Sequence, residues 1–318
     1  MRLPCFTDVL RAGQTLRPHL PPTPAWSYPA LDAACGAHVV VKHENVQPTG
    51  AFKVRGGLTL LATMPAAERD RGVVTYSTGN HAQSIAYAAR EFRAPCTVVM
   101  PEGANESKHR AVEALGATVV LRGTTLEESA TAATLLASRC GARFVSPADE
   151  PALIAGVGTA YLELLTAAPD LDVIVVPVGG GSNAAAASLV VRTLAPHIEV
   201  IGVQSDAAPA AHDSWHAGHL VERPNRTEVE GLSTGRGFAL TQQLMRDGLA
   251  GFVLVSDNDI RAAQRLLLSH AHTLAEGAGA AGLAVVLGDP PRFAGRQVGI
   301  ACTGANASLD QLRSLLAA

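Results

Sequence analysis

The segment VIVVPVGGGSNA, residues 173–184, joins an apolar strand to a helix through three consecutive glycines. Its run of β-branched residues has no polar alternation, which is typical of a strand buried on both faces of a parallel sheet. Gly179, Gly180 and Gly181 let the backbone turn sharply, so that several N–H groups can face one set of ligand oxygens. The segment predicts a phosphate-binding loop, with a structural tight turn as the alternative. It lacks GxGxxG spacing and a Walker lysine, which disfavours P-loop chemistry and a nucleotide-binding oxidoreductase.

Seven other short apolar runs share this β-branched character and are bounded by turn residues. Helical patterns lie between several of them, and such alternation of strands and helices is typical of a doubly wound α/β fold with mostly parallel strands. The runs are HVVVK (38–42), GVVTYST (72–78), CTVVMP (96–101), TVVLRG (118–123), EVIGVQS (199–205), FVLVS (252–256) and QVGIACTG (297–304). The helical patterns cover residues 81–92, 107–115, 126–139 and 260–274.

Several strand–helix units follow one another between Gly72 and Asp149, enough to form a small open sheet of their own. The flanking parts of the chain supply further strands on both sides. The sequence therefore predicts a small domain, residues 64–148, inserted in a larger domain formed by residues 1–63 and 149–318. Ligands tend to bind in the cleft that such an arrangement creates.

Composition excludes several classes of protein. The chain has 318 residues, of which 47% are hydrophobic and 17% charged, and its net charge is −3. The charges are scattered, which argues against a nucleic-acid partner. No apolar run approaches the ~20 residues of a membrane span, and the N-terminus lacks the apolar stretch of a secretory signal. Five dispersed cysteines indicate free thiols in a reducing compartment, so we expect a cytoplasmic protein.

Lys53 lies in ENVQPTGAFKVRGG, residues 44–57, where a turn precedes a helix that runs through Leu61. A lysine that is desolvated near the positive end of a helix loses its proton more easily, which favours an amine nucleophile. For a single lysine considered alone, a plain surface position is the usual explanation. The surrounding string makes Lys53 a candidate catalytic residue.

Two further strand ends carry small polar residues. In STGNHA, residues 77–82, the N–H groups at a helix start form an anion site that suits a carboxylate or phosphate; an ordinary helix cap is the alternative. In ACTGAN, residues 301–306, Thr303 would point into the crevice at the carboxyl end of a strand, and a simple turn is the alternative.

Three histidines, His212, His216 and His219, occur at positions that would share one face of a helix. No acidic residue stands at a helpful spacing among them. A polar surface helix is therefore favoured over a metal site, and no metal is predicted.

Together the four strings resemble the fold-type II pyridoxal-phosphate enzymes, and more narrowly the serine/threonine dehydratase and racemase family. The resemblance covers nearly the whole chain, in the family's order and approximate spacing. It implies two open, twisted, mostly parallel sheets, as in the tryptophan synthase β subunit. The larger domain would bind the pyridoxal 5'-phosphate cofactor, the smaller would carry the substrate loop, and the chain would form a homodimer.

The resemblance also implies roles for individual residues. Lys53 would be the Schiff-base lysine and Phe52 would pack against the cofactor ring, while Thr303 would face the pyridine nitrogen. The other cofactor-binding and substrate-binding positions match the family's motifs in order. They are Asn80 at the cofactor 3′-oxygen, Ser77, Thr78, Asn80 and His81 at the substrate carboxylate, Gly179, Gly180, Gly181 and Ser182 at the cofactor phosphate, and Gly231 and Glu276 near the ring.

The implied activity is β-elimination from a β-hydroxy amino acid, such as L-threonine, L-serine or a bulkier analogue, to give a 2-oxo acid and ammonia. Lys53 would remove the α-proton. A neutral hydroxyl at the pyridine nitrogen would disfavour transamination and favour prompt loss of the β-substituent. The alternatives are β-replacement, as in cysteine synthase or threonine synthase, and racemisation. From a different class, a non-catalytic ligand-binding relative is a further alternative.

Three positions depart from the family's pattern. Thr78 stands where racemases use a serine on the second face. It can still donate a proton, which makes it a second candidate catalytic residue, but its methyl group crowds the site, so racemase activity is only a side possibility. Gln204 and Ala210 occupy positions where acids would bind a divalent cation, which predicts that this metal site is absent. Ser182 and Asn183 replace a glycine and an apolar residue. The motifs look like a subgroup with unusual β-hydroxy substrates, which includes hydroxyectoine-utilisation and phenylserine-type dehydratases.

Overall fold

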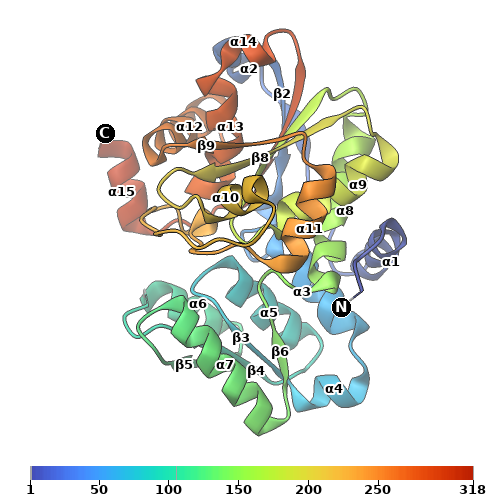
Figure 1. The fold of residues 1–318 in the computed structure, drawn as a ribbon, viewed down its shortest axis with the longest axis vertical. Helices are drawn as coiled ribbons and strands as arrows, with labels where there is room; N and C mark the ends of the chain where they lie inside the picture. The colour runs from blue at the N-terminus through green and yellow to red at the C-terminus, as the bar shows by residue number, and fades with distance from the viewer. Residues whose placement is uncertain (1, 105, 318) are drawn as a thin grey trace.

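The computed structural model describes residues 2–104 and 106–317, which form two sheets flanked by helices (Figure 1). The larger sheet has six strands in the order β1-β2-β10-β7-β8-β9, and all neighbours pair in parallel except β1 with β2. Its strands are β1 (Ala25–Ser27), β2 (His38–His43), β7 (Val173–Pro177), β8 (Glu199–Ser205), β9 (Gly251–Val255) and β10 (Gln297–Cys302).

The smaller sheet has four parallel strands in the order β5-β4-β3-β6. All of them fall between Val73 and Val145, inside the segment predicted as the small domain. They are β3 (Val73–Tyr76), β4 (Cys96–Met100), β5 (Thr118–Leu121) and β6 (Arg143–Val145). The predicted fold class is confirmed, and each apolar run named above contains a strand of one of these two sheets.

Helices cover both faces of the larger sheet. On one face, the apolar core joins the sheet to α1 (Phe6–Leu16), α8 (Pro151–Ala167), α9 (Ser182–Leu194), α10 (Ala210–Ala217) and α11 (Ala239–Gly248). On the other face, it joins the sheet to α2 (Pro29–Cys35), α12 (Asp257–His270), α13 (Gly277–Gly288) and α14 (Pro290–Phe293). Helix α13, GAGAAGLAVVLG, is apolar on all sides, as expected of a helix enclosed in a core.

The smaller sheet is also covered on both faces. Helices α3 (Lys53–Thr63), α5 (Asn80–Glu91) and α6 (Glu106–Ala114) share one apolar core with it, and α7 (Leu126–Cys140) packs on the other face. Helix α3 contacts both α5 and α8, so it belongs to both halves of the molecule. The exact boundaries 64 and 148 therefore stay a proposal. The remaining helices are α4 (Ala66–Arg71), α15 (Leu309–Ala317) and the short 3₁₀ helices η1 (Glu44–Val46) and η2 (Glu230–Leu232).

The structure corrects the expected elements at three places. The helix expected over residues 260–274 ends at His270, because His272 adopts a positive φ of 51° that a helix cannot continue. Strands β1 and β6 were not predicted; each has only three residues at an edge of its sheet. His219 lies beyond the end of α10 and so does not share a helical face with His212 and His216.

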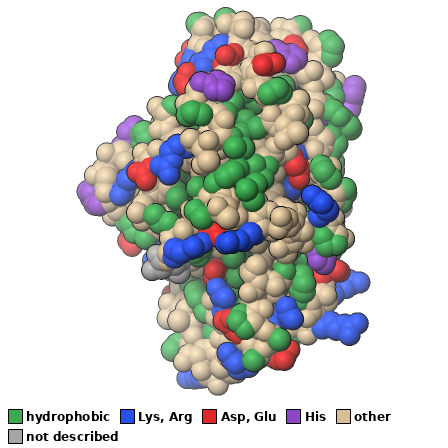
Figure 2. Space-filling model, turned by 90° about the vertical axis from the view of Figure 1, so that its right-hand side faces the viewer, with side chains coloured by type: hydrophobic (Ala, Val, Ile, Leu, Met, Phe, Trp, Pro, Cys, Tyr) green, Lys and Arg blue, Asp and Glu red, His purple; other side chains and the backbone are tan. Residues whose placement is uncertain are grey.

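The helices and the surface bear on whether the chain binds a membrane or another protein. Within the described residues, no helix combines the length and the apolar character needed to cross a membrane. Figure 2 shows apolar side chains gathered near the middle of one face, with Lys and Arg side chains below them.

Candidate active site

A cleft of about 1240 Å³ collects residues from both halves of the molecule. It is lined by the segments that follow β3, β7 and β10 and by the start of α3. Polar groups at the carboxyl ends of parallel strands lie at one edge of a sheet, which explains why distant motifs meet here. Every residue that the sequence predicted for the site, from Phe52 to Thr303, lines this cleft.

Lys53 is the first residue of α3, and its side chain reaches across the cleft toward the glycine loop. Its Nζ donates a 2.6 Å hydrogen bond to Ser182 Oγ and a 3.2 Å hydrogen bond to the Pro147 carbonyl oxygen. The Phe52 ring lies 5.3 Å from the amine. Burial lowers the pKa of Lys53 to about 8, because a desolvated amine is less easily charged. More of this amine is therefore uncharged near neutral pH than of an ordinary lysine.

The glycine loop connects β7 to α9 and has no room for side chains. A Cβ atom at Gly179 would collide with the Gly231 carbonyl oxygen, and Gly181 has a positive φ of 92°. Thr241 Oγ1 donates a 2.7 Å hydrogen bond to the Gly180 carbonyl oxygen, which fixes the turn. The loop opens the 13-residue helix α9, whose first N–H groups form an anion site at this point.

The segment of residues 77–81 connects β3 to α5 and includes the start of that helix, where free N–H groups suit an anion. Gly79 N–H donates a 3.1 Å hydrogen bond to Ser77 Oγ, and Gly79 rather than Ser77 or Thr78 is the residue that caps α5. Asn80 begins the helix. Ser77, Thr78 and Asn80 are all half-buried, so their polar groups can be reached from the cleft.

A chain of amides ties Asn80 to Glu276. Asn306 Nδ2 donates to Asn80 Oδ1 at 2.7 Å and to the Thr49 carbonyl oxygen at 2.8 Å. Asn80 Nδ2 therefore points to Glu276 Oε1, at 2.6 Å. Burial raises the pKa of Glu276 to about 7, although the hydrogen bond from Asn80 opposes this shift. Asn306 was inside a quoted motif but was not predicted as a site residue.

His81 is buried and uncharged at the base of the cleft. Burial and the nearby Lys53 amine lower its pKa well below the ordinary value. Thr75 Oγ1 donates its hydrogen to the Val145 carbonyl oxygen at 2.8 Å, so the 2.8 Å contact with His81 Nε2 requires the imidazole to be the donor. A neutral imidazole fixed in this way orients the start of α5 rather than supplying a positive charge.

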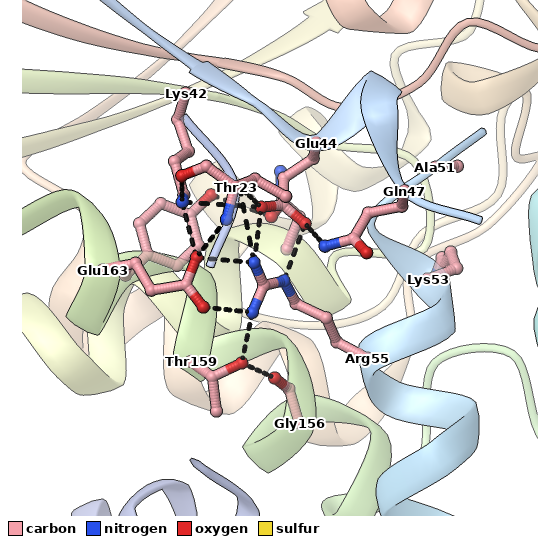
Figure 3. Close-up of polar contacts among 12 residues, drawn as sticks. Thr23, Lys42, Glu44, Gln47, Ala51, Lys53, Arg55, Gly156, Thr159 and Glu163 are labelled. Atoms are coloured by element: carbon pink, nitrogen blue, oxygen red, sulfur yellow. Dashed lines mark hydrogen bonds and ion pairs between the residues drawn. The ribbon is translucent and has the colours of Figure 1, made fainter. Parts of the chain in front are cut away.

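A buried ion network lies beside the first turn of α3 (Figure 3). It was not predicted from the sequence. The Arg55 guanidinium donates to both carboxylate oxygens of Glu44, at 2.7 and 2.8 Å, and to both of Glu163, at 2.7 Å each. Lys42 Nζ also donates to Glu163, at 2.6 Å. Arg55, Lys42 and Glu44 are each about 1% exposed. The network joins β2, η1 and α8 to α3, where Arg55 stands two residues after Lys53.

The residues of the cleft fit pyridoxal phosphate. The cofactor needs an amine, a cradle of N–H groups for its phosphate and a hydrogen-bonding group at its pyridine nitrogen. Lys53 and the glycine loop supply the first two. Among the described residues, Thr303 Oγ1 is buried without any hydrogen-bond partner. Buried hydroxyl groups usually have a partner, so Thr303 fits the third requirement, a hydrogen bond to the cofactor.

Gln204, one of the two residues that stand where the family's cation ligands would be, takes part in a network of hydrogen bonds. Gln204 is fully buried, and its Oε1 accepts hydrogen bonds from the backbone N–H groups of Ala211 and His212, at 3.1 and 3.0 Å. Its Nε2 donates to Thr234 Oγ1 at 3.3 Å. Within residues 2–104 and 106–317, no group of three or more His, Cys, Asp or Glu side chains is placed to hold a metal ion.

Comparison with known proteins identifies the family of this chain. A model of the family described as "Pyridoxal-phosphate dependent enzyme" matches residues 16–304. The chain is 36% identical over 310 residues to an L-threonine ammonia-lyase of Thermotoga maritima, across 97% of this chain and 77% of that protein. It is 34% identical over 317 residues to an L-threo-3-hydroxyaspartate ammonia-lyase of a Pseudomonas species, across 99% of each chain.

A solved structure of a similar protein has the same fold. The crystal structure of a serine racemase from Dictyostelium discoideum superposes with a TM-score of 0.90 at 30% identity, across 96% of this chain and 99% of that chain. The two sheets, the lysine at the cleft and the family match lead to one assignment. This chain belongs to the pyridoxal-phosphate dependent enzyme family and has the fold of its fold-type II members.

Proposed function

We propose that the chain is a lyase that removes water from a β-hydroxy amino acid and releases a 2-oxo acid and ammonia. One observation carries the proposal: Lys53, whose pKa is lowered by burial, the start of α5 and the Thr303 hydroxyl, which has no hydrogen-bond partner among the described residues, line the same cleft. Relatives named as ammonia-lyases support this reading. L-Threonine and L-serine are the first substrates to test.

Lys53, Thr78 and Thr303 have distinct tasks in this reaction. Bound pyridoxal phosphate supplies an electron sink for the pair left at the α-carbon. The N–H groups at the start of α5, with Thr78, hold the substrate carboxylate, and Lys53 removes the α-proton. Thr303, a neutral hydroxyl, would hold the cofactor without adding positive charge to its ring. Charge is therefore relieved by loss of the β-substituent.

The proposed reaction is tested by the visible absorption spectrum of the purified protein with pyridoxal phosphate. We expect the band of a lysine-bound cofactor, which shifts when L-threonine, L-serine or a bulky β-hydroxy amino acid is added, together with ammonia and a 2-oxo acid. A new amino acid formed only when a thiol is added would instead establish β-replacement. A D-amino acid product would establish racemisation. Absence of the band would leave a non-catalytic ligand-binding protein.

The pKa of Lys53 predicts how cofactor-free protein takes up pyridoxal phosphate. Only the uncharged amine reacts, so the rate of reconstitution should rise with pH and level off above about 8. An ordinary lysine would reach this plateau only above ~10.4. Stopped-flow absorbance at several pH values measures the midpoint, with free N-α-acetyllysine as the reference amine. A protein midpoint equal to that of the reference would contradict the desolvation of Lys53.

Arg236 favours a second substrate class, a β-hydroxy amino acid with a second carboxylate. Its guanidinium lines the cleft 5.6 Å from the Phe238 ring. Two other cations line the cleft: Lys53 is the reactive amine and Lys108 is paired with Glu230. Among the described residues, Arg236 has no acidic partner within 4.0 Å. A relative named for L-threo-3-hydroxyaspartate is consistent with an anion at this position.

Changing Arg236→Leu should therefore raise KM for L-threo-3-hydroxyaspartate by about 10- to 100-fold, since hydrogen bonds to charged groups are worth ~1.5–3 kcal/mol. KM for L-serine, which has no second carboxylate, should change by less than about 3-fold. Steady-state kinetics with both substrates measure the difference. Arg223→Leu is the matched control, because Arg223 is exposed and already paired with Asp213. Equal increases for both substrates would show that Arg236 does not read the side chain.

Three finer points complete the proposal. We propose a homodimer, and the apolar area in Figure 2 supports it, because exposed apolar patches commonly mark protein interfaces. Light scattering of the purified protein measures its mass. A cytoplasmic location and a hydroxyectoine-utilisation or phenylserine-type substrate stay predictions, and the bulky substrate in the panel above tests the latter.

A further inference from the structure

Ser182 is the side chain closest in contact with the catalytic amine. It is 2% exposed, and its Oγ accepts the 2.6 Å hydrogen bond from Lys53 Nζ. The second partner of Lys53 is the Pro147 carbonyl oxygen, which can only accept. No carboxylate among the described residues hydrogen-bonds to Lys53. The Ser182 hydroxyl is thus the one group bonded to this amine that can both receive a proton and pass one on.

We propose that Ser182 is a further catalytic residue, which relays a proton from Lys53 to the departing β-hydroxyl group of the substrate. The inference rests on the proposed elimination reaction. It answers a question that the reaction raises, because hydroxide is a poor leaving group and must depart as water. The proton that Lys53 takes from the α-carbon has to reach the β-oxygen, and Ser182 lines the cleft beside that amine.

The relay balances in atoms and charge. The Cα–H bond breaks and its proton forms a bond to Lys53 Nζ, which becomes an ammonium. One ammonium proton moves to Ser182 Oγ while the Ser182 hydroxyl proton moves to the β-oxygen. The Cβ–O bond breaks, water leaves, and the electron pair from Cα–H forms the Cα=Cβ bond. Lys53 ends as the free amine and Ser182 as the hydroxyl, so no further reactant is needed.

The surroundings of Ser182 suit this relay. As the first residue of α9, it stands at the positive end of a 13-residue helix, which stabilises negative charge that develops on its oxygen during the transfer. Burial lowers the pKa of Lys53 to about 8, so its ammonium gives up a proton more readily than that of an ordinary lysine. The 2.6 Å distance from Lys53 Nζ to Ser182 Oγ is short for an N–H···O hydrogen bond, so the two atoms are close enough for direct proton transfer.

Two substrates that differ in their leaving group test the proposal. L-Serine loses hydroxide and needs the proton, whereas β-chloro-L-alanine loses chloride and does not. In Ser182→Ala, we expect kcat for L-serine to fall about 100-fold, the lower range for loss of a general acid. We expect kcat for β-chloro-L-alanine to stay within about 3-fold of that of the unaltered enzyme, because its elimination needs no acid. Ser182→Gly should show the same selective loss, and Ser182→Thr, which keeps a hydroxyl, should restore activity on L-serine.

Cofactor binding gives a readout that is independent of turnover. Titration of cofactor-free Ser182→Ala with pyridoxal phosphate, followed by protein fluorescence, should raise Kd by less than about 10-fold, because the substitution removes one hydroxyl and keeps the backbone N–H groups at the start of α9. Equal losses on both substrates, with weakened cofactor binding, would show that Ser182 only holds the phosphate and would overturn the relay while the lyase function stands. If the unaltered enzyme released ammonia from neither substrate, the proposed function would fail and the relay with it.

Discussion

Replacing Lys53 with alanine should lower the rate of elimination at least about 10³-fold, because the variant lacks the amine that removes the α-proton. The visible band of the lysine-bound cofactor should disappear as well. The fold should survive, since among the described residues the Lys53 side chain makes only two hydrogen bonds, to Ser182 and to the Pro147 carbonyl oxygen. Ammonia release and the absorption spectrum measure the loss, and circular dichroism measures the fold.

Lys108→Ala is the matched control for this variant. Lys108 also lines the cleft, but its amine is paired with Glu230. The control should keep the visible band and lose less than about 10-fold in rate, since a partly exposed ion pair is worth only ~0.2–1 kcal/mol. Lys53→Ala protein that retained the band and more than a tenth of the activity would contradict the assigned role of Lys53.

The sequence predicted the long central strands because burial on both faces requires uninterrupted apolar residues, which are visible locally. VIVVP, for example, became the fully buried strand β7. Strand β1 carries no such signal, since its residues AWS are partly or fully exposed at the sheet edge. The end of α12 was also missed: apolar spacing continues to Leu274, but His272 has a positive φ, which the spacing of apolar residues does not encode.

The candidate site divides in the same way. Motifs such as STGNHA and the glycine loop were predictable because each combines a strand end with a helix start within a few residues. Asn306, Arg236 and Ser182's bond to Lys53 depend on segments that are distant in the chain and meet only in the folded molecule. Their local sequences resemble ordinary turns. Only the packing of the two sheets reveals which polar groups share the cleft.

Arg55 shows this dependence most strongly. A sequence reading places it on a helix two residues after Lys53, where it could equally face solvent. In the structure it is 1% exposed and holds two carboxylates from η1 and α8 (Figure 3). Burial of the ions carries a cost, but removal of one partner leaves the others uncompensated. The Arg55 side chain therefore anchors the first turn of α3, and with it the position of Lys53.

Changing Arg55→Met should lower the free energy of unfolding by about 3–5 kcal/mol, the range for breaking a buried ion pair by removing one partner. Methionine keeps an unbranched apolar chain but leaves Glu44 buried beside Lys42 alone. Urea denaturation at pH 7 measures the change. Arg110→Met is the control, because Arg110 pairs with Glu106 on the surface, where both side chains are more than 70% exposed. That variant should lose at most ~1 kcal/mol.

The pH dependence separates a lost ion pair from a lost packing contact. Burial alone would raise the pKa of Glu44, but Arg55 and Lys42 hold it below its ordinary value in the folded protein. Glu44 therefore stabilises the unaltered protein above ~4.3, its unfolded pKa, and this contribution is lost as the pH falls through the lower folded value. Without Arg55, burial dominates, so the pKa of Glu44 rises above its unfolded value and protonation stabilises the variant. The stability gap between the two proteins should thus narrow between pH 7 and pH 4.5. A gap that stays constant would assign the loss to packing of the Arg55 side chain rather than to its charge.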